Sequence, residues 1–530
     1  TYAGTATRFA QRAVVSEAVI RGWDVATADI SKAFLQGVSY KELAEITGEP
    51  EREVNFALPP GSIPILQKVD GFKDFNPFLE VCHCDKPGTG LVDAPRAFAL
   101  KLTQVTDKLG IKPTSVDDQL CVLHKEGRLV GIFAKHVDDI KMAGEKGFVD
   151  WLCAELEKTF GKLKLEWNDF SNCGIHHIKL PNGTVEHDQS DFIKALKIPS
   201  HPDAEDHAPP ERILGPESHT LYQSSVGAVA FCALTRVDAA VIIVALQRFG
   251  HAPQVQHFKR LRVLIRWLQA TAHRKIVYRP FAGRSVGHLR LISDAAFRKE
   301  DEDAHALKGA VFVRVDEDPT SVLPHAEKAT RKHVCHIIEY YSRKQRHVTR
   351  STFGAELYAA CDAADMGMLL AQLLHEIVFG VDTFSRAKQR REEGTWAIPM
   401  SLSVDAMSVF AAVTASQIKI PAEKALWSHV QYLRELLDIR VLLWLVWIDT
   451  RDMHADGLTK GSVERTALQA IMNGEYMTEH EYKAWQPRLA RRPVDVGTKI
   501  DSVDTNDVDD LADAMSKMKV SDGDVPKSRL

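Results

Sequence analysis

The sequence contains few cysteines, and their spacing excludes the common cysteine-based sites. Only eight occur among 530 residues, and no two of them form a Cys-x-x-Cys pair. Cys82 and Cys84 flank His83, but no second pair of ligands follows at zinc-finger spacing. A disulfide framework and a structural zinc site are therefore not expected. Free thiols are typical of a reducing, intracellular compartment.

Long apolar runs and a signal peptide are also missing. No apolar run approaches the roughly 18 residues that a membrane span needs, so we expect no membrane partner. The chain begins with Thr1 rather than Met, and we therefore expect a fragment or a processed product.

Acidic residues are absent from one long stretch and concentrated in another. Residues 239–293 hold ten Lys and Arg but no Asp or Glu. Residues 501–530 hold eight Asp against four Lys and Arg, which accounts for the whole net charge of −4. A basic stretch inside an otherwise neutral chain predicts a surface for a polyanion. The length favours about two to four globular domains.

Two adjacent carboxylates, Asp138 and Asp139, lie between two apolar-rich runs. This pattern predicts a hairpin with both acids at its turn. Neighbouring carboxylates repel, so both stay ionised only when cations lie between them, and Mg²⁺ commonly binds such acids together with substrate phosphates. A polar surface turn is the alternative for this stretch alone. A third acid, Asp29, ends a predicted strand over residues 23–29, where a cap is the alternative role.

A helix predicted over residues 256–271 carries two separate stripes. Apolar residues step by three and four along one side, as in a helix that packs on a core. Basic residues step similarly along another side, without an acid among them. Contact with a phosphate backbone would be salt-dependent and sequence-independent, and a plain surface helix is the alternative. The basic residues are Lys259, Arg262 and Arg266, with Arg260 beside them; the apolar ones are Phe258, Leu261, Ile265 and Leu268.

In the second half of the chain, acids stand at the ends of predicted strands and at the start of a helix. Each acid alone is most simply a cap or a surface group. Together the elements follow a β-β-β-α-β-α pattern that gathers the acids at one end of a sheet. The acids are Asp294, Glu356, Asp405 and Asp456; the strands are predicted at 289–294, 309–315, 336–342, 401–405 and 441–448.

Three ordered blocks resemble the reverse transcriptase of copia-type LTR retrotransposons. They are Asp29-Ile-Ser-Lys-Ala-Phe-Leu-Gln-Gly37, Gly90-Leu-Val-Asp-Ala-Pro-Arg-Ala-Phe98 and His136-Val-Asp-Asp139, and the resemblance extends to about residue 461. It implies a right-hand polymerase in which Asp29, Asp138 and Asp139 hold two Mg²⁺ ions, with Mn²⁺ as an alternative. The implied partners are an RNA template, a DNA primer and dNTPs.

Several positions depart from the family pattern near the implied nucleotide site. His136 stands where the family usually has Tyr, and Asp93 stands where it has Gln, close to Arg96. Asp93 is expected to add negative charge near the triphosphate. The chain begins just ahead of the Asp29 block, so the upstream fingers segment is expected to be missing. The alternative function is a degenerate remnant that binds nucleic acid and retains at most RNase H activity.

Four later blocks resemble the RNase H domain attached to these reverse transcriptases. They are Ser293-Asp294-Ala-Ala, Ser351-Thr-Phe-Gly-Ala-Glu356, Val404-Asp405-Ala and Ala455-Asp456-Gly-Leu-Thr-Lys460. The resemblance implies that the four acids ligate two Mg²⁺ ions and that the substrate is the RNA strand of an RNA–DNA hybrid. His454 is expected in a surface loop, or alternatively as a proton shuttle.

The expected architecture is a multidomain chain of α+β and α/β classes. Residues 1–200 are predicted to form the palm and partial fingers, and residues 201–284 a basic helical thumb or connection. Residues 285–465 are predicted to form an RNase H-like domain, and residues 466–530 a largely disordered tail. By the resemblance, protease and integrase of the same Pol polyprotein are further partners.

Overall fold

A computed structural model describes residues 4–205, 207–283, 286–297, 306–319, 325–326 and 330–487. These residues fall within the first of two compact units, Thr1–Arg491. The second unit, Arg492–Leu530, lies outside the described residues, and with it most of the predicted disordered tail.

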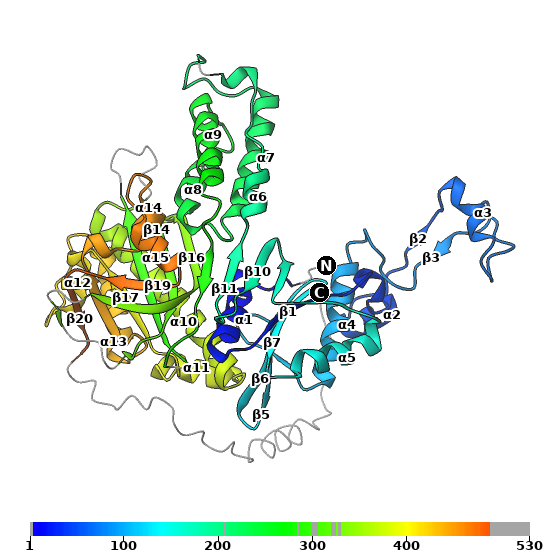
Figure 1. The fold of residues 1–530 in the computed structure, drawn as a ribbon, viewed down its shortest axis with the longest axis horizontal. Helices are drawn as coiled ribbons and strands as arrows, with labels where there is room; N and C mark the ends of the chain where they lie inside the picture. Colours follow the sequence, from blue (N-terminus) through cyan, green and yellow to red (C-terminus); the bar gives the residue numbers. More distant parts are fainter. Residues whose placement is uncertain are drawn as a thin grey trace, which may run out of the picture. The chain divides into compact units, whose positions relative to one another are not determined.

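The first half of the chain contains a six-stranded antiparallel sheet with helices on both faces (Figure 1). Side chains alternate along a strand, so each face can meet a different helix. In β1, Val25 joins the core that includes α1, whereas Ala26 and Ala28 join the core of α4 and α5. In sheet order the strands are β4 (Lys112–Pro113), β5 (Leu120–Lys125), β6 (Arg128–His136), β7 (Asp139–Gly144), β1 (Val25–Asp29) and β8 (Lys164–Trp167); the helices are α1 (Arg8–Arg21), α4 (Ala94–Lys108) and α5 (Phe148–Phe160).

The segment between β1 and α4 carries short elements with many exposed apolar side chains. Residues 50–85 contain a two-stranded sheet of β2 and β3. Such a small sheet contributes little core, which is consistent with the exposure of Ile65, Phe78 and Leu79. The elements are α2 (Tyr40–Thr47), β2 (Asn55–Phe56), α3 (Ile63–Leu66) and β3 (Cys82–His83).

A four-stranded antiparallel sheet and a group of helices follow. The last strand, β12, returns to pair with β11, so the helices between these strands form one excursion from the sheet. The predicted helix over 256–271 is confirmed as α9, and its apolar stripe is buried. The elements are β9 (Asp169–Asn172), β10 (Ile175–Lys179), β11 (Val185–Asp188), α6 (Ser190–Ala195), α7 (Pro216–Cys232), α8 (Ala240–Gln247), α9 (Val255–Ala270) and β12 (Ile276–Tyr278).

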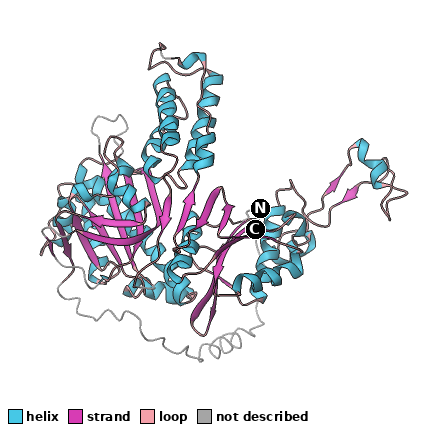
Figure 2. Cartoon of the chain, viewed as in Figure 1, coloured by secondary structure: helices cyan, strands magenta, loops and turns pink. Residues whose placement is uncertain are grey.

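An eight-stranded mixed sheet organises the second half (Figure 2). Its centre is antiparallel from β13 through β14 to β16, and β17 and β18 add in parallel on the other side of β13. In sheet order the strands are β15 (His325–Ala326), β20 (Tyr482–Trp485), β18 (Trp444–Ile448), β17 (Met400–Val404), β13 (His288–Ala296), β14 (Leu307–Val315), β16 (Arg331–Lys344) and β19 (Glu475–Thr478). The helices are α10 (Thr352–Phe379), α11 (Phe384–Glu393), α12 (Met407–Thr414), α13 (Trp427–Asp438), α14 (Asp456–Thr459) and α15 (Thr466–Met472).

This sheet continues past residue 465, where the sequence predicted the domain to end. β19 pairs with β16, and β20 pairs with β18. The prediction of a tail from residue 466 is therefore wrong for these strands. Each has only four residues, too few for a periodic pattern to stand out, although Tyr476 and Tyr482 are buried.

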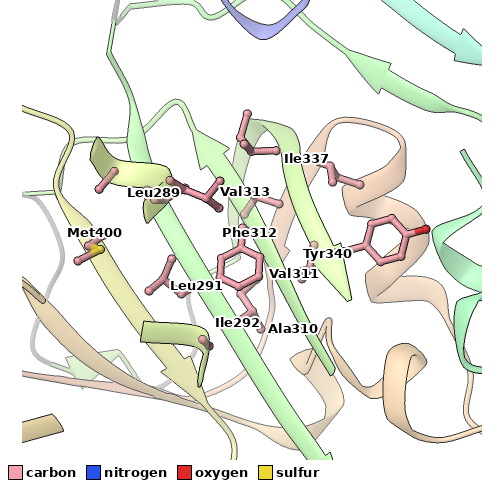
Figure 3. Close-up of a cluster of buried hydrophobic side chains, with 14 of the residues drawn as sticks. Leu289, Leu291, Ile292, Ala310, Val311, Phe312, Val313, Ile337, Tyr340 and Met400 are labelled. Carbon is pink, nitrogen blue, oxygen red and sulfur yellow. The ribbon is translucent and has the colours of Figure 1, made fainter. Parts of the chain in front are cut away.

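α10 is long and apolar enough to span a membrane by length and composition, which the search for apolar runs in the sequence did not anticipate. In the structure 72% of its most apolar window is buried. The helix packs against β13, β14 and β17. Figure 3 shows the core at these strands, including Leu291, Phe312 and Ile337. The apolar composition of α10 is therefore explained by the central position of this helix in the core.

A buried ion pair connects α1 to the eight-stranded sheet. Arg314 Nη1 lies 2.8 Å from Glu17 Oε1, and both side chains are fully buried. Arg21 Nε lies 2.9 Å from the other carboxylate oxygen of Glu17. Burial raises the pKa of Glu17, but the guanidinium groups of Arg314 and Arg21 outweigh burial and hold the pKa below its usual value. The carboxylate is therefore charged in the folded protein.

Glu17→Gln is expected to lower the free energy of unfolding by about 3–5 kcal/mol, because the buried charge of Arg314 loses the opposite charge of the Glu17 carboxylate. Urea denaturation measures the loss. Since folding depresses the pKa of Glu17, its contribution is present above the unfolded pKa of 4.5 and is lost as pH falls through the folded pKa. Glu155→Gln, which removes an ion pair with the exposed Lys158, is the control and should cost less than about 1 kcal/mol. Equal losses for the two variants would contradict the prediction.

Candidate metal centre

Three carboxylates from separate elements of the eight-stranded sheet converge. Asp294 lies on β13, Asp405 directly follows β17, and Asp456 begins α14. One carboxylate oxygen of each lies within 4.8 Å of the others. The parallel register of β13 and β17, in which Ile292 is opposite Ser403, brings the first two acids side by side. These three acids and Glu356 are called the acidic cradle below.

Glu356 approaches the cradle from α10. The helix begins after Ser351, whose hydroxyl accepts a hydrogen bond from the amide of Gly354. The amide of Ala295, next to Asp294 on β13, donates to Glu356 Oε2 at 3.1 Å. Burial, followed by the charges of Asp294 and Asp405, raises the pKa of Glu356 well above its usual value.

The pKa values of Asp405 and Asp456 are raised as well. Burial and then the charge of Asp294 raise the pKa of Asp405, and the same two causes raise the pKa of Asp456 to about 6. Buried carboxylates that repel one another are stabilised by a cation between them. Carboxylate oxygens are hard ligands of the kind that Mg²⁺ and Mn²⁺ prefer, so the residues fit such an ion.

Basic and hydroxyl groups also reach into the cradle. Lys460 Nζ lies 2.5 Å from Asp456 Oδ1 and 3.5 Å from Asp294 Oδ1. The hydroxyl of Thr459 donates to Asp294, and the hydroxyl of Thr450 donates to Asp405 at 3.2 Å. No role for these three residues was predicted from the sequence, although Thr459 and Lys460 belong to the block Ala-Asp-Gly-Leu-Thr-Lys.

A glycine allows α14 to approach the cradle. Gly309 on β14 lies directly opposite Asp294 on β13. A Cβ at this position would lie 2.6 Å from Leu458 Cβ and 2.9 Å from Thr459 Cγ2. Any larger residue would therefore push α14, and with it Asp456, away from Asp294. Gly309 was not predictable as a site residue, because this contact joins segments that are distant in sequence.

His454 is not a surface residue, so that expectation is wrong. The side chain is fully buried, its ring stacks on Tyr476, and its Nε2–H donates to Met477 O at 3.0 Å. Burial lowers the pKa of His454 to about 4, which keeps the ring neutral. These contacts hold the ring in the protein interior and do not favour the alternative role of a proton shuttle.

Mg²⁺ is expected to raise the melting temperature of the chain by about 2–5 °C when it binds the cradle. The raised pKa of Asp456, about 6, means that ionisation of this acid costs stability as pH rises from 3.8 through 6. Above pH 6, a bound metal ion offsets the loss of stability that ionisation of Asp456 causes. Below pH 6, the ion competes with a proton for the Asp456 carboxylate. Thermal unfolding with Mg²⁺ and with a chelator, on either side of pH 6, measures the effect.

Asp405→Asn should reduce this stabilisation, whereas Asp365→Asn should retain it. Asp365 lies on α10 and accepts a hydrogen bond from Tyr432, outside the cradle. A metal effect that is independent of pH and of Asp405 would contradict a cradle that binds the ion.

A second group of acids lies on the six-stranded sheet, as the sequence predicted. Asp29 on β1 pairs directly with Asp139 on β7, and Asp138 lies in the turn between β6 and β7. Val137 in this turn has φ 62°, which is uncommon for a β-branched residue. Burial, then the charges of Asp138 and Asp29, raise the pKa of Asp139. Within the part of the chain that the structure describes, these three acids do not reach the 4.8 Å spacing of the other group.

The three residues expected near a nucleotide lie in two different elements, the β6–β7 hairpin and the first turn of α4. His136 pairs across the hairpin with Asp139. Asp93 is buried at the start of α4, where it forms an ion pair with Arg52, and Arg96 is half-buried on the same helix. Arg52 therefore compensates the charge of Asp93, so the expected excess of negative charge at this position is not present.

The four basic residues of α9 do not share one environment. Arg260 and Arg266 are exposed, whereas Lys259 and Arg262 are half-buried, and Lys259 donates to Ala208 O at 3.4 Å. Lys259 and Arg260 line an apolar groove of about 480 Å³ between α8 and α9, and Arg262 and Arg266 do not. The predicted single basic face is therefore divided between two residues that line this groove and two that do not.

Comparison with known proteins supports the resemblance that the sequence blocks indicated. The chain is 25% identical to the retrovirus-related Pol polyprotein from transposon RE1 of Arabidopsis thaliana and 24% identical to the one from transposon RE2, over 382 residues in each case. Each match covers 69% of this chain but 23% of the relative, so the chain spans about a quarter of these relatives. No protein-family model matches the chain. The predicted resemblance to copia-type Pol polyproteins is thus confirmed.

Proposed function

We propose that the chain is the reverse transcriptase and RNase H part of a retrotransposon Pol polyprotein. It would be an RNA-directed DNA polymerase that also cleaves the RNA strand of RNA–DNA hybrids. The observation that carries the proposal is the convergence of Asp294, Asp405 and Asp456 within 4.8 Å, with Glu356 beside them. The similarity to the two Pol polyproteins gives this acidic group a chemical context.

The arrangement of the two large sheets supports the domain assignment. An antiparallel group of β13, β14 and β16, extended in parallel by β17 and β18, is the order expected of an RNase H-like domain. The six-stranded sheet, which carries acids on β1 and at the β6–β7 turn, would be the polymerase palm. The helices α6 to α9 would form the thumb or connection.

In the cradle, the four acids would hold two Mg²⁺ ions, which supply the electrophilic chemistry of phosphodiester hydrolysis. Thr450 and Thr459 orient the carboxylates of Asp405 and Asp294 by donating hydrogen bonds. The Ala295 amide fixes Glu356, and burial keeps the group close to the other acids. Such fixed side chains maintain the ligand geometry that an ion requires.

In the palm, Asp29, Asp138 and Asp139 would hold the ions that bind the incoming dNTP. Direct pairing of Asp29 with Asp139 fixes two of these carboxylates on neighbouring strands. The exposed Arg260 and Arg266 would contact the phosphates of the template–primer duplex. Such contacts make binding weaken as the salt concentration rises.

A polymerase-deficient remnant with RNase H activity is the second candidate, favoured by the wider spacing of the palm acids. The test is to assay the purified chain with Mg²⁺ both for primer extension on an RNA template and for cleavage of a labelled RNA–DNA hybrid. Both activities support the proposal, and cleavage alone supports the remnant. Absence of both, in a folded chain, would overturn the two assignments.

A further inference from the structure

We propose that Lys460 is a resident cation of the acidic cradle, which a divalent metal ion must displace in order to bind. This inference rests on the proposed function of the cradle and adds to it a residue that regulates metal affinity. Lys460 follows α14 directly, and its amide donates to Asp456 O at 2.9 Å, so the side chain starts beside the cradle.

The ammonium group of Lys460 bridges two acids that come from different elements. Nζ lies 2.5 Å from Asp456 Oδ1 and 3.5 Å from Asp294 Oδ1. Thr459 donates to the other oxygen of Asp294, whereas Oδ1 accepts no hydrogen bond within the described part of the chain. The ammonium therefore faces the one oxygen of this buried carboxylate that lacks a donor.

Lys460 is also the one Lys, Arg or His within 4.0 Å of a cradle carboxylate, as far as the described residues show. Four acids and one ammonium leave a local excess of negative charge, so part of the repulsion is offset and part is not. A metal ion placed among the same oxygens would repel the ammonium strongly at such short range. The two cations therefore compete for Asp294 and Asp456.

The side chain of Lys460 is able to leave the cradle. It is 31% exposed, whereas the side chains of Asp294 and Asp456 are 0% and 13% exposed. A lysine stem is flexible and its ammonium is strongly hydrated, so moving the group outward into water is possible without unfolding α14. The buried guanidinium of Arg290, which pairs with Glu317 elsewhere in the same sheet, has no such route to solvent.

Removing the ammonium should strengthen metal binding and weaken the metal-free fold. For Lys460→Met, which keeps the length of the side chain, we expect the dissociation constant for Mn²⁺ to fall by about three- to thirtyfold. In a chelator, the same variant should melt at a lower temperature than the parent, because the acids lose their counter-charge. A residue that merely braced Asp456 would, when removed, weaken metal binding instead.

The experiment is a titration with Mn²⁺, followed by the electron paramagnetic resonance signal of the free ion. All chains carry Asp138→Asn, which disables the other proposed site, and a chain that also carries Asp294→Asn gives the background. Lys460→Arg retains the charge and should keep the parent affinity. Lys158→Met, which removes an exposed lysine paired with Glu155 on α5, is the matched control and should change nothing.

Tighter binding in Lys460→Met alone supports the inference. Unchanged or weaker binding in that variant overturns it, and leaves the proposed function intact if the parent still binds Mn²⁺ through Asp294. If the parent binds no more Mn²⁺ than the Asp294→Asn background, the metal cradle itself is wrong, and the proposed function fails together with the inference.

Discussion

Asp294→Asn is expected to reduce cleavage of RNA in an RNA–DNA hybrid by at least about 10²–10³-fold, the range seen when one preorganised catalytic group is removed. Asp294 is the fully buried member of the cradle, and its charge contributes to the raised pKa of Glu356, Asp405 and Asp456. It is therefore the acid that all the others face, and no neighbour replaces its oxygens.

The same substitution is expected to leave the fold intact. Asparagine has nearly the shape of aspartate, and loss of one charge relieves repulsion among the remaining acids. The melting temperature in a chelator should therefore stay unchanged or rise while activity falls, which separates this result from simple destabilisation. Asp365→Asn, on the same helix as Glu356 but outside the cradle, is the control. Cleavage that persists in Asp294→Asn at the rate of the parent would refute the assignment.

The elements that carry these acids were predictable because each acid follows or opens a segment with a strong local pattern. The strand before Asp405 appears in the structure close to its predicted limits, and Glu356 lies near the start of a helix, as predicted. The neighbours of each strand were not predictable in the same way. The parallel pairing of β13 with β17, which joins Asp294 to Asp405, connects residues more than a hundred positions apart.

What the sequence could not reveal depends on contacts between distant segments. Gly309 is needed because Leu458 and Thr459 pack against it, and nothing near Gly309 in the sequence indicates this. Arg52 neutralises Asp93, from which it is separated by 41 positions of the sequence. His454 was expected in a surface loop, but the strand β19 covers it.

The ion pair between Glu17 and Arg314 is a further contact between distant segments that could not be predicted from the sequence. Arg314 lies in a predicted strand and Glu17 lies on α1, and their pairing joins the two halves of the chain. A charged residue on a helix is usually assigned to solvent. Glu17 is buried because the partner that neutralises it arrives from the eight-stranded sheet, which only the tertiary structure shows.

Asp138→Asn is expected to reduce primer extension by at least about 10²–10³-fold and to leave hybrid cleavage within about twofold of the parent. Asp138 lies in the turn outside the β6–β7 ladder, so its charge is removable without loss of a strand pair. Its charge contributes to the raised pKa of Asp139, and the substitution should lower that pKa and leave the sheet folded. Comparing both activities of this variant with those of Asp294→Asn makes each site the control for the other. If Asp138→Asn impaired both activities equally, the two acidic groups would not be independent sites. If the parent cleaved hybrids through Asp294 but never extended a primer, the palm acids would have no catalytic role. The chain would then be better described as the polymerase-deficient remnant.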